Sequence, residues 1–179
     1  MLTSGLSSLE EAPRPVRLWL VPVASTFAGS CLSLIPLVVT VPLLPPFGLL
    51  VALAWRLLRP EMWGAWVALP LGLADDLIGG APLGSAMTLW TIAFLALDLA
   101  DHYRAWRDAL VDWQLGSIAI IFCVFGAWAI ALFSGGAGPL WTALFQAGIA
   151  ILGFPLVARV CSRLDRWRLS SGPGAVARD

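Results

Sequence analysis

The chain alternates between long apolar runs without any charge and short polar connections. Residues 18–55, 77–97 and 113–158 contain no Asp, Glu, Lys or Arg. A helix that crosses the hydrocarbon core of a membrane needs about 20 such residues. The runs therefore predict a polytopic membrane protein. Their continuous apolar character excludes an outer-membrane barrel, whose strands alternate in polarity.

Proline and glycine divide these runs into six predicted helices, because both residues disfavour helix interiors and favour turns. Prolines at positions 42, 45 and 46 interrupt the first run, and a glycine-rich segment at 134–139 interrupts the third. The predicted spans are 18–39, 43–58, 62–78, 84–103, 114–133 and 139–160. We expect a cytoplasmic N-terminal tail over 1–17, a six-helix membrane domain over 18–160 and a basic C-terminal tail over 161–179.

The eleven basic residues, all of them arginines, predict the orientation of these helices. They lie in the two tails, at the ends of the second and sixth predicted helices, and in the connections from the second to the third and from the fourth to the fifth. The three opposite connections, at 40–46, 79–83 and 134–138, contain no basic residue. Basic residues accumulate on the cytoplasmic side of membrane proteins, so both termini are expected to be cytoplasmic.

The composition excludes several classes of function but does not identify the function itself. Charged residues make up 12% of the chain, against roughly 25% in an ordinary soluble domain, and the net charge of zero gives nucleic acid no attraction. Cys31, Cys123 and Cys161 are too few and too scattered for a disulfide framework or a metal site. We expect no cofactor and no metal, and the short loops leave no room for a soluble catalytic domain.

The third predicted helix has two unlike faces at about 100° per residue. The first face carries Gly64, Ala65, Ala68, Gly72, Asp75 and Asp76, and the second carries Trp63, Trp66, Pro70 and Leu73. Small residues let another helix backbone approach closely, and a carboxylate within a membrane faces the bundle interior or water. Both arguments turn the first face inward.

Three roles stay open for Asp75 and Asp76, which end this helix at a turn. Either carboxylate can accept N–H bonds from the start of the fourth helix, where unpaired donors and a positive dipole end lie. Either can also bind a ligand, a cation or a partner. Catalysis with magnesium and a diphosphate would need a second acidic cluster and basic residues on the same side. The sequence contains no hydrolase, zinc-protease or phosphate-loop motif.

Two further patterns follow this turn. A seam at helical spacing on the fourth helix predicts packing against the third helix, with pocket lining as the alternative. Its members are Gly84, Thr88, Thr91, Leu95 and Asp98. Beyond the seam, aspartates surround Arg104 within residues 98–112. This pattern predicts weak ion pairs along a solvated helical extension, or a docking surface for a cytoplasmic partner.

From Pro46, an apolar run leads to Trp55-Arg56 and then to Arg59-Pro60-Glu61. Gly72 then precedes the segment Asp76-Leu77-Ile78-Gly79-Gly80-Ala81-Pro82-Leu83-Gly84. This last segment is similar to the Asp-Leu-x-(Ser/Gly)-Gly-x-x-x-Gly turn of the bacterial rod shape-determining MreD family, which the chain resembles. The number of spans, the short outer loops and the basic C-terminal tail fit the family as well. Asp75 and the acidic stretch 98–112 depart from its pattern.

The resemblance implies a non-enzymatic, multi-pass component of the cell-elongation machinery in the bacterial inner membrane. It implies binding to MreC and association with the MreB filament, RodA and a class B penicillin-binding transpeptidase in lateral peptidoglycan synthesis. It also implies a six-helix bundle similar to the substrate-binding subunits of energy-coupling-factor transporters. The candidate packing or partner residues are Gly64, Ala68, Gly72, Asp76, Gly80, Pro82, Gly84 and Thr88.

Two other functions stay open. A vitamin-binding subunit of a membrane transporter would need a closed pocket on the outer side, lined by polar groups near Asp76, Ser85 and Thr88. An integral-membrane enzyme that acts on lipid or polyprenyl phosphates would need a basic or metal cluster beside Asp75 and Asp76.

Overall fold

The computed structural model describes residues 15–33, 44–103 and 108–170, and its regular structure within them is entirely helical. Its helices are α1 (Pro15–Leu32), α2 (Phe47–Leu58), α3 (Ala65–Gly79), α4 (Ser85–His102), α5 (Ala109–Phe133) and α6 (Leu140–Ser170). The predicted all-helical fold with six helices is therefore confirmed. Most of the predicted N-terminal tail, part of the connection at 40–46 and the chain after residue 170 lie outside the described residues.

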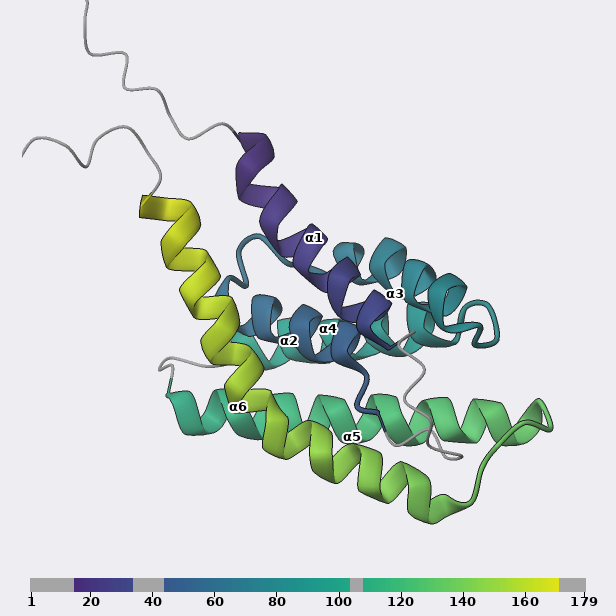
Figure 1. Ribbon diagram of the computed structural model, residues 1–179. Coiled ribbons are helices and arrows are strands. Elements are labelled where there is room, and N and C mark those ends of the chain that lie inside the picture. Colours follow the sequence, from purple (N-terminus) through teal and green to yellow (C-terminus); the bar gives the residue numbers. More distant parts are fainter. Residues whose placement is uncertain (1–14, 34–43, 104–107, 171–179) are drawn as a thin grey trace, which may run out of the picture.

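The helices run back and forth, so their connections gather at two opposite ends (Figure 1). The first end holds the start of α1, the connection from α2 to α3, the end of α4, the start of α5 and the end of α6. We call it the arginine end. The second end holds the connections 80–84 and 134–139, which contain no basic residue. We call it the acidic-turn end, because Asp75 and Asp76 precede the first of these connections.

α2 is the central helix of the bundle. Nine of its twelve residues are buried, and α1, α5 and α6 pack around it. Twelve residues extend about 18 Å at 1.5 Å per residue, which is less than the roughly 30 Å hydrocarbon core of a membrane. A helix this short is tolerated at membrane depth where protein surrounds it, and α2 meets that condition.

Several helix boundaries differ from the predicted ones: α1 covers Pro15–Leu32 rather than 18–39, α2 begins at Phe47 rather than near residue 43, and α3 begins at Ala65 rather than near residue 62. α6 ends at Ser170 rather than near residue 160, and α5 begins at Ala109 rather than near residue 114. In the added part of α6, Cys161, Asp165 and Arg168 are buried at helical spacing and form an inward face. The charged sequence after residue 158 therefore does not end the helix, because part of its charge packs inside the protein.

α5 and α6 are the described helices whose length and apolar composition suffice to cross a membrane. Large apolar side chains cover their outer surfaces, among them Ile118 and Leu132 on α5 and Leu144 and Leu152 on α6. α6 changes direction near its middle (Figure 1). It contains Pro155, which removes one backbone hydrogen bond and favours a bend.

Candidate functional sites at the two ends of the bundle

The carboxylate of Asp76 caps the start of α4. Its Oδ1 accepts hydrogen bonds from the Ala86 N–H at 2.9 Å and the Ser85 hydroxyl at 2.8 Å. Its Oδ2 accepts from the N–H groups of Gly84 at 2.9 Å and Met87 at 3.3 Å. Asp76 is only 1% exposed, and the positive dipole end of α4 stabilises its charge in place of a cation. The sequence left three roles open for Asp76, and these hydrogen bonds show that it caps α4.

Two glycines with positive φ shape the turn that brings α4 over Asp76. Gly80 follows α3 with φ of 66°, and Gly84 precedes α4 with φ of 92°. A side chain at either position would be strained, because L-residues rarely adopt this region. Between them, the carbonyl of Pro82 accepts a hydrogen bond from the Ser85 N–H at 3.0 Å. The turn is thus fixed by backbone geometry at both of its limits.

Gly72 allows α3 and α4 to approach closely. A Cβ atom on Gly72 would lie 2.6 Å from the Cα of Met87 and 2.7 Å from its backbone nitrogen, well inside van der Waals contact. Ala68, one turn earlier, and Asp76, one turn later, are also buried. The inward orientation of the small-residue face is therefore confirmed at these positions, and the helix that meets it is α4 of the same chain.

The start of this face was predicted wrongly. Gly64 is the N-cap residue that precedes α3, and it is half-buried. Trp63, expected on the outward face, is fully buried in the core. The helix begins only at Ala65, so helical periodicity does not apply to either residue. Trp66, which lies within the helix, is exposed as predicted.

The seam predicted on α4 is wrong at Thr88 and Leu95, whereas Gly84 and Asp98 do form hydrogen bonds with α3. Thr88 is exposed, and Leu95 is 54% exposed. The hydroxyls of Thr88 and Thr91 donate to the carbonyls of Gly84 and Met87, at 2.6 Å each, so these hydrogen bonds stay within α4. The inward face of α4 consists of Ser85, Leu89, Trp90, Ala93, Phe94 and Leu97. Apolar residues occupy every face of this helix, so the spacing of the threonines did not identify the buried one.

Asp75 has surroundings different from those of Asp76. Its side chain is hydrogen-bonded to Ser30 of α1 and approaches α2 at Gly48. A Cβ atom on Gly48 would lie 2.7 Å from the Asp75 Oδ1 and 2.3 Å from the Ser30 hydroxyl oxygen. Asp75 therefore joins α1, α2 and α3 near the acidic-turn end, whereas Asp76 joins α3 to α4.

A small cavity of about 130 Å³ borders both carboxylates. Its lining includes Asp75, Asp76, Ser85 and Gln146, but Thr88, which was expected there, points away. Pockets that bind small molecules usually occupy about 300–1,000 Å³. Within the described part of the chain, no three His, Cys, Asp or Glu side chains are grouped to hold a metal ion. The cavity has room for a few water molecules.

Arg56 lies buried at the arginine end between two carboxylates of α4. Its Nη2 pairs with Oδ1 of Asp98 and lies 3.0 Å from Oδ2 of Asp101. Oδ2 of Asp98 also accepts a hydrogen bond from the Ala65 N–H at 3.3 Å, at the start of α3. Asp98 and Asp101 thus connect α2, α3 and α4 at the arginine end. Arg104, the partner expected for Asp101, lies outside the described residues.

A second cluster of charges joins the end of α2 to α6. Oδ2 of Asp165 accepts hydrogen bonds from Nε and Nη2 of Arg59, at 3.2 and 2.8 Å, and its Oδ1 accepts one from Nε of Arg168 at 2.7 Å. The buried Arg168 guanidinium also lies over the ring of Trp55, 5.1 Å from its centroid. Asp165 raises the pKa of Arg59 above its usual value, because a hydrogen-bonded carboxylate stabilises the cation.

Sequence reasoning missed both of these clusters. Arg56 and Asp98 are 42 residues apart, and Arg59 and Asp165 are 106 apart. One signal could have found them: the predicted orientation places the ends of the second, fourth and sixth helices on the same side. No family model matches this chain, nor does any curated protein or solved structure.

Proposed function

We propose that this chain is a non-enzymatic, multi-pass protein of the bacterial inner membrane that acts in cell elongation, as MreD proteins do. Six helices cross the membrane, both termini are cytoplasmic, and the arginine end faces the cytoplasm. The bundle binds MreC and helps to organise lateral peptidoglycan synthesis and cell shape. MreB, RodA and a class B penicillin-binding transpeptidase are the further partners in this proposal.

The observation that carries this proposal is the geometry of the acidic turn. The residues that resemble the MreD turn each contribute to its structure, since Asp76 caps α4, and Gly80 and Gly84 adopt positive φ. Gly72 admits the backbone of α4. The oxygens of Asp76 already accept four hydrogen bonds, which leaves this carboxylate poorly suited to hold a metal or to move protons. The turn therefore supports a packing role better than a catalytic one.

Membrane placement is supported by the surface of the bundle and by its charge. Large apolar side chains are exposed on α1, α3, α4, α5 and α6, for example Leu20, Leu77, Leu95, Ile118 and Leu152. Lipid tails would cover such a surface, which a soluble monomer seldom exposes over so wide an area. The connections at the acidic-turn end carry no basic residue, as expected for the outer side.

The test is purification of the tagged full chain from detergent-solubilised membranes of its own bacterium. We expect MreC to co-purify, and we expect rod-shaped cells to become round when the chain is depleted. A photo-reactive amino acid placed in turn at Leu20, Leu95, Ile118 and Leu152 then samples one outward position on each of four helices. A crosslink to MreC identifies the contacting helix. Absence of MreC together with unchanged cell shape would contradict the proposal.

The transporter alternative gains no support from the cavity. At about 130 Å³ it is smaller than the roughly 300 Å³ at which small-molecule pockets begin. The alternative of a phosphate-processing enzyme needs a basic cluster beside Asp75 and Asp76. The arginines in the described part of the chain lie elsewhere. They are found at the start of α1, near the end of α2, in the connection from α2 to α3, and in the second half of α6.

A further inference from the structure

Three arginines form a row along the outer side of α6. Arg159, Arg163 and Arg166 are spaced by four and three residues, so they share one face of the helix. All three are exposed, and none forms an ion pair within residues 15–33, 44–103 and 108–170. Arg168 on the opposite face is buried against Asp165. The helix thus separates the charge that stabilises the fold from the charge that remains available to a ligand.

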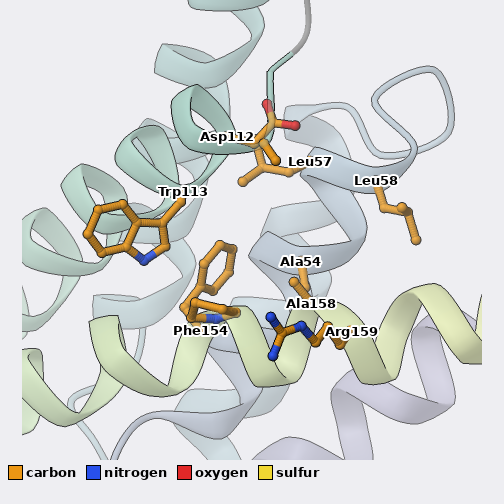
Figure 2. Close-up of a pocket in the computed structure, with 10 residues that line it drawn as sticks. Ala54, Leu57, Leu58, Asp112, Trp113, Phe154, Ala158 and Arg159 are labelled. Carbon is orange, nitrogen blue, oxygen red and sulfur yellow. The ribbon is translucent and has the colours of Figure 1, made fainter.

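An apolar groove of about 310 Å³ meets this row at Arg159. It lies between α2, α5 and α6, and its lining includes Ala54, Leu57, Trp113, Phe154 and Ala158 (Figure 2). Figure 2 shows the Arg159 side chain reaching back along α6 toward Ala158, whereas Asp112 lies across the groove on α5. A row of basic side chains and an apolar groove are therefore adjacent on the surface of the bundle.

This combination matches the chemistry of a membrane lipid. An acyl chain fills apolar space, and a phosphodiester pairs well with guanidinium groups. Arginines next to the cytoplasmic end of a membrane helix attract anionic headgroups, and Trp113 suits the interface between headgroups and tails. Arg159 lines the α6 side of the groove and Arg163 lies one turn further along the same helix, so the headgroup is expected on the α6 side.

We propose that the groove and the arginine row form a binding site for an anionic phospholipid of the inner leaflet. One acyl chain lies in the groove against Phe154 and Ala158, and the phosphate contacts Arg159 and Arg163. The site rests on the membrane placement proposed above, but it does not depend on MreC. It would anchor the bent second half of α6 to the cytoplasmic surface of the membrane.

The test is native mass spectrometry of the full chain, purified in mild detergent and titrated with dioleoyl phosphatidylglycerol or dioleoyl phosphatidylcholine. We expect preferential retention of phosphatidylglycerol. Each substitution in the pair Arg159→Gln and Arg163→Gln is expected to weaken its binding about fivefold, and the double variant about 25-fold. Both side chains are exposed, so the thermal unfolding midpoint of the double variant should stay close to that of the unchanged chain.

Two further experiments distinguish the contribution of the apolar groove to lipid binding from that of the arginines. Ala158→Phe fills the groove without changing the charge, and we expect it to weaken phosphatidylglycerol retention. Ala24→Phe adds the same bulk on the exposed surface of α1 and should leave retention unchanged. Glycerophosphoglycerol, the headgroup without acyl chains, should not compete. Equal retention of the two lipids, an unchanged affinity in the double arginine variant, or full competition by the free headgroup would overturn the site, whether or not MreC binds.

Discussion

The two ends of the bundle stabilise buried carboxylates in opposite ways. At the acidic-turn end, Asp76 accepts three backbone N–H bonds and one hydroxyl bond, all from the start of α4. At the arginine end, the buried Asp165 and the partly exposed Asp98 pair with guanidinium groups. A helix terminus supplies partial positive charge through its free N–H groups, so a carboxylate can be buried without a cation. The two ends of the bundle therefore stabilise their carboxylates with different donors, backbone N–H groups at one end and guanidinium groups at the other.

The difference also separates local from distant stabilisation. The partners of Asp76 lie 8 to 11 residues further along the chain, within one helix–turn–helix unit. The partner Arg59 of Asp165 lies 106 residues away. We expect the acidic turn to form with α3 and α4 alone, whereas the arginine end needs the whole bundle.

The largest effect is expected at the arginine end, from Asp165→Ala. This change leaves the buried Arg168 without its carboxylate, and breaking one partner of a buried ion pair costs about 3–5 kcal/mol. The free energy of unfolding in detergent should fall by this amount. The double variant Asp165→Leu with Arg168→Leu removes both charges and should recover much of the loss. Equal losses in the single and double variants would show that charge burial is not the cause.

A slightly smaller loss is expected from Gly72→Leu at the other end. The added side chain meets the backbone of Met87, and overpacking of this kind costs about 3 kcal/mol. Leu73→Ala, on the neighbouring outward position, should cost less than about 1 kcal/mol, as surface changes do. Thermal unfolding of both variants in one detergent measures the difference. Similar midpoints would contradict the close contact between α3 and α4.

Asp76→Asn sharpens the comparison, because it keeps one acceptor oxygen but removes the charge. An amide nitrogen would then face backbone N–H donors, and we expect a loss of about 2 kcal/mol. Asp75→Asn should be neutral or stabilising, since Asp75 lacks the N–H donors that surround Asp76 and its amide can still bond to Ser30. The two variants differ by one position in sequence, so an equal response would refute the distinction between them.

The smallest effect concerns the backbone of the turn. Gly84→Ala places a side chain at φ of 92° with no neighbouring atom within 4 Å, so its cost is purely conformational, about 1–2 kcal/mol. Gly79→Ala lies within α3 and is equally free of neighbours. It should stabilise the protein by about 0.5–1 kcal/mol, because alanine favours helices. A gain at both positions would show that the turn does not require positive φ at Gly84.

The acidic turn could be predicted from the sequence because its interactions are local. Capping by an Asp at the end of one helix, glycines at the limits of the turn, and a small residue at a helix contact each leave a short-range pattern. Asp76, Gly72, Gly80 and Gly84 follow these patterns. The burial of Trp63 was not predicted, because helical periodicity was applied to a residue that lies two positions before Ala65, the first residue of α3.

The arginine end could not be predicted in the same way. Eleven acidic and eleven basic residues allow many pairings, and spacing along one helix favoured Arg104 over the distant Arg56 as the partner of Asp101. The end of α6 was set near residue 160 because charge begins there, although Asp165 and Arg168 face inward. Long-range pairing depends on how helices meet, and a nearly uniform apolar pattern carries little information about that.

Cysteine labelling of intact cells tests the central claim. This claim is that the acidic-turn end faces the outer side of the inner membrane and the arginine end faces the cytoplasm. Ala81→Cys and Glu61→Cys each place an exposed thiol at one end, in a background with Cys31, Cys123 and Cys161 replaced by serine. A maleimide that cannot cross the inner membrane should label position 81 in intact cells. It should label position 61 only after permeabilisation. Labelling of position 61 in intact cells, with protection of position 81, would contradict the account.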